Sequence, residues 1–186
     1  MFGNAYNQAW FGAAMSKRGY VVAAISHPGT STWLRDADQR RALWERPKDV
    51  SRVIDHVTTP GALPIEVLSD QVFMAGHSLG GFTAALLAGA RYDADQLESF
   101  CDGRSDEMVC GIFADWDIAK TPQDRTQMEA DLADPRIRAF ALFDLGGTQS
   151  FSPQSLAKID SPLLVFGAPI TNSGLDLDIE SRALVK

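Results

Sequence analysis

The amino-acid sequence predicts an α/β fold, in which a parallel β-sheet is flanked by helices. Unbroken apolar runs recur along the chain, and such runs are typical of strands that a parallel sheet buries on both faces. The expected strands are Tyr20–Ile25, Val72–Ala75, Ile137–Phe143 and Pro162–Phe166. Helical patterns separate these runs, so strands and helices alternate. With 186 residues and 45% hydrophobic content, the chain is long enough for a single domain with a buried core.

Each expected helix has its own local signal. Ala5–Lys17 places apolar residues at helical spacing, and Gly19 follows at a position where helices commonly end. The next helix begins near Pro47 and has one apolar stripe, formed by Val50, Val53, Ile54 and Val57. Phe82–Ala88 is rich in the strong helix formers Ala and Leu, and a short helix is expected over Gln154–Ile159.

Charge and hydropathy exclude several classes of protein. The chain has 24 acidic and 17 basic residues, a net charge of −7 that argues against a protein built to bind nucleic-acid phosphates. Its apolar content excludes intrinsic disorder. No stretch approaches the roughly eighteen apolar residues of a membrane-spanning helix. The first residues also lack the basic flank and apolar core of a signal peptide, so nothing in this chain is expected to direct export.

The excess acidity comes from one segment. Residues 91–134 contain twelve Asp or Glu and four Lys or Arg, which gives a local charge of −8. We interpret this acidic segment as a polar surface insertion. It contains no D-x-[DN]-x-[DN]-G calcium loop, and its two cysteines lack the further ligands that zinc requires, so no metal is expected.

The sequence Gly76-His77-Ser78-Leu79-Gly80 matches the pattern G-x-S-x-G, between an apolar strand and an Ala-rich helix. In this nucleophile elbow the serine lies on a sharp strand-to-helix turn, where glycines permit the tight backbone. Ser78 is therefore the candidate nucleophile. The backbone N–H of Leu79 is the candidate donor to the oxyanion, assisted by the helix N-terminus.

Three separated segments, in order, resemble α/β-hydrolases: GYVVAAISHPGTS from Gly19 to Ser31, GHSLGG from Gly76 to Gly81, and DPRIRAFALFD from Asp134 to Asp144. The branch they resemble most is that of the predicted dienelactone hydrolases, which are similar to platelet-activating-factor acetylhydrolases. The resemblance implies a serine hydrolase that acts on a small-molecule carboxylic ester through an acyl-enzyme at Ser78. It implies neither a metal nor an organic cofactor.

The same resemblance implies a catalytic acid after the serine and a histidine last. Asp144 ends a strand at the place where acetylhydrolase-like members have their acid, although an aspartate ahead of Gly146-Gly147 could equally be a turn residue. Other α/β-hydrolases place the acid after the next strand. For that arrangement the alternatives here are Asp176 and Asp178.

The histidines depart from the implied order, because His27, His56 and His77 all precede Ser78. We expect His77 to pack or form a hydrogen bond beneath the elbow, His27 to form a loop near the site and His56 to lie at the surface. Gly3 resembles the end of a glycine loop that would supply a second oxyanion amide. The chain thus looks truncated at both ends, and a catalytically silent hydrolase-like module is the alternative function.

Two pairs of residues in the acidic segment leave alternatives open. Cys101 and Cys110 lie nine residues apart and either form a disulfide, which would place the protein in an oxidising compartment, or remain two thiols. Phe113 and Trp116 either line an acyl pocket over the elbow or anchor the segment to the core.

Overall fold

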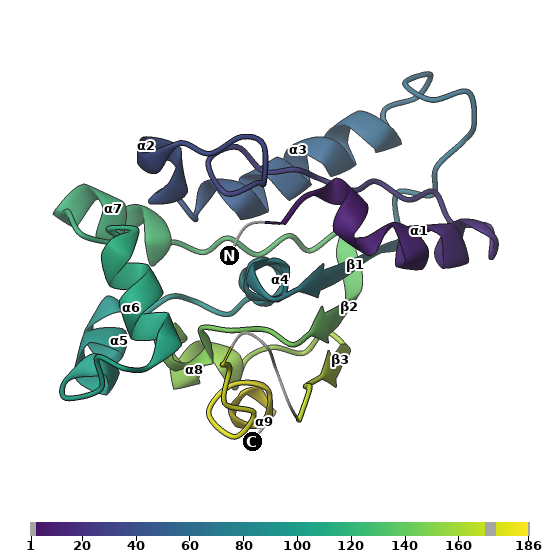
Figure 1. Ribbon diagram of the computed structural model, residues 1–186. Helices are drawn as coiled ribbons and strands as arrows, with labels where there is room; N and C mark the ends of the chain where they lie inside the picture. Colours follow the sequence, from purple (N-terminus) through teal and green to yellow (C-terminus); the bar gives the residue numbers. More distant parts are fainter. Residues whose placement is uncertain (1–2, 170–173, 186) are drawn as a thin grey trace. The chain divides into compact units, whose positions relative to one another are not determined.

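The computed structural model describes residues 3–169 and 174–185. The chain divides into two compact units, residues 1–68 and residues 69–186, which are described separately. The second unit contains a parallel sheet with helices around it (Figure 1), and this confirms the predicted α/β class.

The sheet of the second unit has three parallel strands in the order β1-β2-β3. They are β1 (Val72–His77), β2 (Ile137–Phe143) and β3 (Leu163–Phe166). The bounds of β2 match the prediction. Strand β1 runs two residues further than predicted, because Gly76 and His77 still pair with Leu142 and Phe143.

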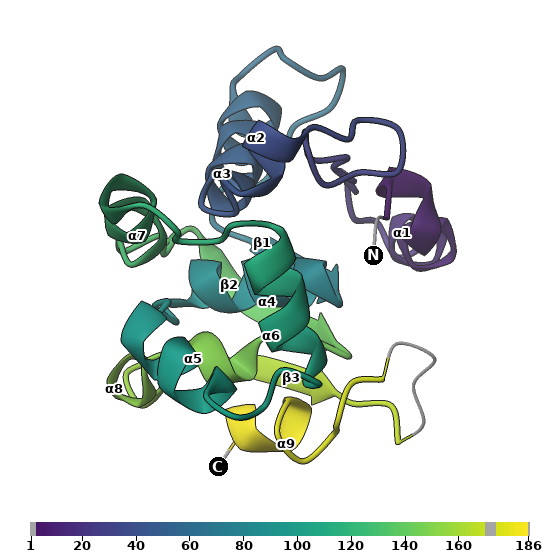
Figure 2. The ribbon, with the colours of Figure 1, turned by 60° about the vertical axis from the view of Figure 1, so that its left-hand side comes forward.

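Helices make up most of the rest of this unit. They are α4 (Leu79–Ala88), α5 (Ala94–Cys101), α6 (Met108–Asp115), α7 (Pro122–Met128), the 3₁₀ helix η2 (Thr148–Ser150), α8 (Pro153–Leu156) and α9 (Ser181–Leu184). Helix α4 follows β1 directly and packs on β1 and β2 (Figure 2). It begins three residues before its predicted start and ends at Ala88, as predicted. The next residue, Gly89, caps the helix with a left-handed φ of 112°. Helix α8 is shorter than the predicted Gln154–Ile159.

The core of the second unit is built around α4. All seven residues from Gly81 to Leu87 are buried, and the Phe82 side chain is completely buried. The Phe82 ring stacks on Phe151, with 4.9 Å between ring centroids, and Leu142 of β2 is also completely buried. The helix is therefore held by apolar contacts along nearly its whole length, which fixes its N-terminal end relative to β1.

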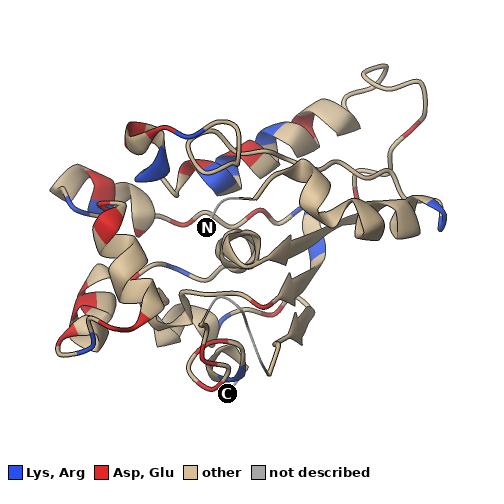
Figure 3. Ribbon diagram, in the orientation of Figure 1, with Lys and Arg blue, Asp and Glu red and all other residues tan. Residues whose placement is uncertain are grey.

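The acidic segment contains α5, α6 and α7, and Figure 3 shows acidic residues at several places along its ribbon. Ion pairs join exposed groups: Arg91 with Asp131 at 2.5 Å, and Arg125 with Asp95 at 2.8 Å. Exposed pairs of this kind contribute little stability. The segment is attached mainly through its apolar side chains, because Met128 is completely buried.

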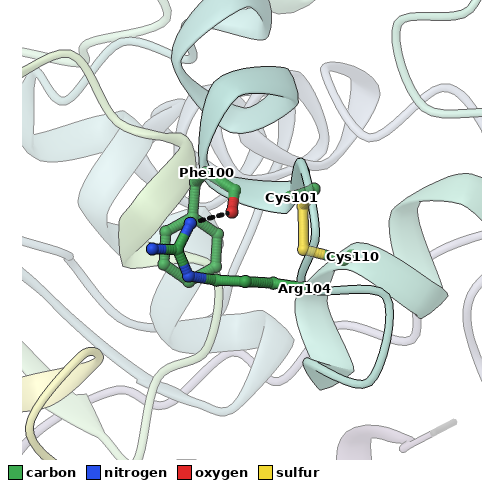
Figure 4. Close-up of a disulfide and its surroundings, with 4 residues drawn as sticks. All are labelled: Phe100, Cys101, Arg104 and Cys110. Carbon is green, nitrogen blue, oxygen red and sulfur yellow. Dashed lines mark hydrogen bonds between the residues drawn. A yellow bond between two sulfur atoms is a disulfide. The ribbon is translucent and has the colours of Figure 1, made fainter.

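A disulfide joins Cys101, at the end of α5, to Cys110 in α6, with 5.6 Å between their Cα atoms (Figure 4). Of the two states left open by the sequence, the structure has the oxidised one. In the loop between the two cysteines, Arg104 donates a hydrogen bond to the carbonyl of Phe100 at 2.7 Å, and its guanidinium lies 5.1 Å from the centre of the Phe100 ring. The disulfide and this contact hold the turn between α5 and α6.

The first unit is helical in its described residues. Its elements are the 3₁₀ helix η1 (Ala5–Gln8) and the helices α1 (Ala9–Ser16), α2 (Ala37–Arg40) and α3 (Glu45–Thr58). Together, η1 and α1 fill the predicted helix Ala5–Lys17, and α3 is the helix expected near Pro47. Val50 and Ile54 of its apolar stripe are buried. Within the described ranges, no helix is both long and apolar enough to cross a membrane.

The predicted strand Tyr20–Ile25 is wrong. No strand is present among the described residues of the first unit. Tyr20, Val21 and Val22 are 42–45% exposed. An apolar run becomes a strand only where a neighbouring strand accepts and donates the ladder hydrogen bonds, and the first unit supplies no such neighbour.

Candidate active site

Ser78 is the single residue between β1 and α4. Its backbone has a φ of 53° and a ψ of −117°, a conformation that is rare and costly for a residue other than glycine. Two hydrogen bonds hold it there. The Ser78 N–H donates to the carbonyl of Phe143 at 2.9 Å, and the Ser78 carbonyl accepts from the N–H of Phe82 at 3.1 Å. The sharp turn that the G-x-S-x-G pattern predicts is therefore present.

The glycines of the motif differ in what they permit. A Cβ atom added to Gly76 would lie 2.1 Å from the carbonyl oxygen of Gly80, so the first turn of α4 crosses directly over the end of β1. A Cβ atom added to Gly81 would lie 2.7 Å from the Cβ atom of Leu145. At Gly80 itself, an added Cβ atom meets nothing within 4 Å. Positions 76 and 81 thus have no room for a side chain. Position 80 has room for one, and it is the backbone carbonyl of Gly80 that lies close to Gly76.

The backbone N–H of Leu79 is the first of α4. The first hydrogen bond of the helix is donated by the N–H of Phe82. The N–H groups of the three residues before it, Leu79–Gly81, therefore have no acceptor inside the helix. This placement suits the oxyanion role predicted for Leu79. Gly3, the second candidate donor, lies in the first unit, where it pairs with Ser31 and its carbonyl accepts from the N–H of Thr32 at 2.7 Å. Its oxyanion role stays a prediction.

Asp144 follows β2 as Ser78 follows β1. Because His77 is paired with Phe143 in the sheet register, Ser78 and Asp144 leave neighbouring strands at the same carboxyl edge, where strands lie about 4.8 Å apart. Asp144 also has a left-handed φ of 48°. Its N–H donates to the Phe166 carbonyl at 2.7 Å, and its Oδ1 accepts from the N–H of Ala168 at 3.1 Å. The structure thus brings the candidate nucleophile and the candidate acid together.

The alternative acids serve a local turn. The Oδ1 atom of Asp176 accepts from the N–H of Asp178 at 2.8 Å, and the Asp178 carboxylate pairs with Arg182 at 2.5 Å. Both aspartates are exposed. Their carboxylates contact the segment that enters α9, and the acid role of either one stays a prediction.

Glu180 is a buried carboxylate that sequence reasoning missed. Only 3% of the residue is exposed, and its Oε2 atom accepts hydrogen bonds from the N–H groups of Gly147 and Thr148, both at 2.9 Å. Burial raises the pKa of Glu180 above its ordinary value, and the two backbone donors act in the opposite direction. Nothing in the local sequence marks this glutamate, because its partners lie more than thirty residues earlier.

The aromatic side chains of the acidic segment anchor it to the core. Phe113 of α6 packs edge-on against Phe82, with 5.8 Å between ring centroids, and stacks on Tyr92 at 6.1 Å. Phe113 and Trp116 are 8% and 6% exposed. These contacts favour the interpretation that Phe113 and Trp116 anchor the segment to the core over the one that they line an acyl pocket. The contact of Phe113 with Phe82 also places α6 against α4.

The three histidines lie in different environments. His77 ends β1 with an exposed side chain, so the expectation that it packs beneath the elbow is wrong. His56 is exposed on α3, as predicted. His27 is buried, and its Nδ1 atom lies 2.8 Å from the Oδ2 atom of Asp49 on α3, a partner that sequence reasoning missed. Among the residues that the structure describes, the carboxylate–imidazole pair is that of Asp49 and His27, within the first unit.

Charge surrounds the pair of His27 and Asp49. Arg46 is buried and donates to the hydroxyl of Thr30 at 2.6 Å, and burial lowers the pKa of Arg46 to about 10. Burial also lowers the pKa of His27, which the hydrogen bond with Asp49 opposes in part. For Asp49, burial raises the pKa, but hydrogen bonds with His27 and Arg52 outweigh it and leave the pKa lowered.

These shifts predict that acid destabilises the first unit. The pKa of His27 is lowered from its ordinary 6.5, so the folded state resists a proton that the unfolded chain accepts. The stability that this supplies is present above about pH 6.5 and is lost as the pH falls below that value. Hydrogen exchange of α3 amides should show protection decreasing from pH 7 to pH 5. This loss of protection should be smaller in His27→Gln than in the wild type, and in His56→Gln it should equal that of the wild type. Equal losses in all three proteins would contradict the role of His27.

No three His, Cys, Asp or Glu side chains of the described residues lie where they could share a metal ion. Compared with family models, curated proteins and solved structures, the chain matches none. The site itself consists of Ser78 on its strained turn and Asp144 at the end of the neighbouring strand, at the same edge of the sheet.

Proposed function

We propose that this protein is a serine hydrolase that acts on carboxylic esters through an acyl-enzyme at Ser78. The observation that supports it most is the backbone of Ser78, which has a φ of 53° and lies between the strand β1 and the buried helix α4. A serine that serves only packing needs no such strained conformation, whereas strain of this kind clusters at functional sites. The resemblance to dienelactone hydrolases and acetylhydrolases supports the same reaction class.

In this proposal the Ser78 hydroxyl oxygen attacks the acyl carbon of the ester while its proton passes to a general base, which the resemblance implies is a histidine. The N–H of Leu79 stabilises the negative charge that develops on the carbonyl oxygen, and the Asp144 carboxylate orients the base. The alcohol leaves with the proton that the base returns. Water then attacks the acyl-enzyme and releases the carboxylic acid. The substrate class is a small-molecule carboxylic ester.

A fluorophosphonate probe tests the proposal, because it labels only an activated serine. The expected result is a single adduct, located at Ser78 by mass spectrometry, together with turnover of a short nitrophenyl ester. Ser78→Ala should abolish both. Ser69→Ala, at an exposed serine of the same unit, should change neither. Absence of an adduct in folded wild-type protein would overturn the proposal.

A second candidate function is a catalytically silent hydrolase-like module. It is favoured by one observation, that all three histidines of the sequence precede Ser78. The same probe separates the two candidates, because a silent module keeps the fold but shows neither labelling nor turnover.

A further inference from the structure

The loop that follows Asp144, residues 145–149, forms hydrogen bonds with the segment that leads into α9. Leu145 is completely buried against Gly81. The Glu180 carboxylate accepts hydrogen bonds from two consecutive backbone N–H groups, those of Gly147 and Thr148. Beside it, the Gln149 amide donates to the carbonyl of Ile179 at 3.1 Å. The loop is therefore held from both sides, by α4 and by the residues around Glu180.

The Glu180 carboxylate is compensated only by uncharged donors. In the described part of the chain, no lysine, arginine or histidine pairs with it, and its partners are N–H groups of the loop. Burying a carboxylate is costly unless donors satisfy it, and an apolar side chain would fill the same space without that cost. A buried glutamate at this place therefore calls for a purpose beyond packing.

The loop needs an external restraint, because its backbone conformation is unusual. Asp144 and Gly147 both have left-handed φ angles, 48° and 98°. We propose that Glu180 is a positioning residue for Asp144: it holds the Gly147–Thr148 turn and so keeps Asp144 in place at the end of β2, at the sheet edge where Ser78 follows β1. This inference rests on the proposed esterase function.

Two substitutions separate positioning from a direct role of the charge. Glu180→Ala leaves both N–H groups without an acceptor, and we expect kcat for a nitrophenyl ester to fall about 10- to 100-fold with KM little changed, since small misplacements of reacting groups cost rate. Glu180→Gln retains an oxygen acceptor and should restore most of kcat. Asp160→Ala, which removes an exposed carboxylate of the same unit, is the control and should leave kcat unchanged.

Amide hydrogen exchange provides a readout that needs no activity. Exchange at Gly147 and Thr148 should accelerate in Glu180→Ala but remain slow in Glu180→Gln and Asp160→Ala. If Glu180→Ala does not fold, Glu180→Asp, whose side chain is one methylene shorter, replaces it in both measurements and should be intermediate.

The contradicting outcomes are distinct. Wild-type protein that is active, with kcat unchanged in Glu180→Ala, would overturn the positioning role alone. Glu180→Gln as slow as Glu180→Ala would show that the charge acts directly and would also overturn it. Wild-type protein without Ser78 labelling would overturn the proposed function, and the positioning role would fall with it.

Discussion

Replacing Asp144 with asparagine should lower kcat/KM by about four orders of magnitude, because a neutral amide neither orients nor stabilises a protonated histidine as a carboxylate does. Asparagine suits this test because it tolerates the left-handed backbone that Asp144 adopts at φ 48°. Its carbonyl oxygen also still accepts the hydrogen bond from Ala168. The substitution therefore removes the charge and leaves the turn in place.

The measurement is ester turnover together with the rate of fluorophosphonate labelling at Ser78. Unfolding by denaturant, followed in parallel, should show a free energy of unfolding close to that of the wild type. Asp176→Asn and Asp178→Asn are the matched controls, because both carboxylates are exposed and engaged in the turn before α9. A large loss of activity in either control, with Asp144→Asn active, would transfer the acid role to the segment after β3.

The sequence predicted the sheet of the second unit well, because each strand there is a continuous apolar run that finds a parallel neighbour. Strand β2 has the predicted bounds, and β1 extends through Gly76 and His77 only because β2 pairs with them. The run Tyr20–Ile25 is as continuously apolar as those strands, yet it forms no strand. Apolar periodicity reports the tendency to be buried, whereas a ladder depends on a partner that local sequence does not specify.

The same distinction applies to the candidate site. The positions of Ser78 and Asp144 could be predicted because a short motif and a strand end mark them, and both strand ends lie at one edge of a parallel sheet. Glu180 could not, because it acts on Gly147 from 33 residues away. The partner of His27 is Asp49, 22 residues later and on a helix whose apolar stripe gave no sign of it. Polar contacts over such separations depend on tertiary packing rather than on local pattern.

Replacing Gly76 with alanine should have the largest effect on the fold, a loss of about 3 kcal/mol in the free energy of unfolding, the upper end of what overpacking usually costs. The added Cβ atom would lie 2.1 Å from the carbonyl oxygen of Gly80, and this contact is with backbone, which no side-chain rotation relieves. Relief would require α4 to move away from β1. That movement would disturb the strained turn at Ser78 and the packing of the buried Phe82 below it.

Gly80→Ala is the matched control, because it adds the same methyl group to the other glycine of the motif. Its Cβ atom meets nothing within 4 Å, and alanine is favoured over glycine in a helix by up to about 1 kcal/mol. We therefore expect Gly80→Ala to have unchanged or slightly increased stability in denaturant unfolding. Equal destabilisation by both substitutions would contradict the close crossing of α4 over β1. A large difference between them would show that the turn requires the space left by the missing side chain at Gly76 but not at Gly80.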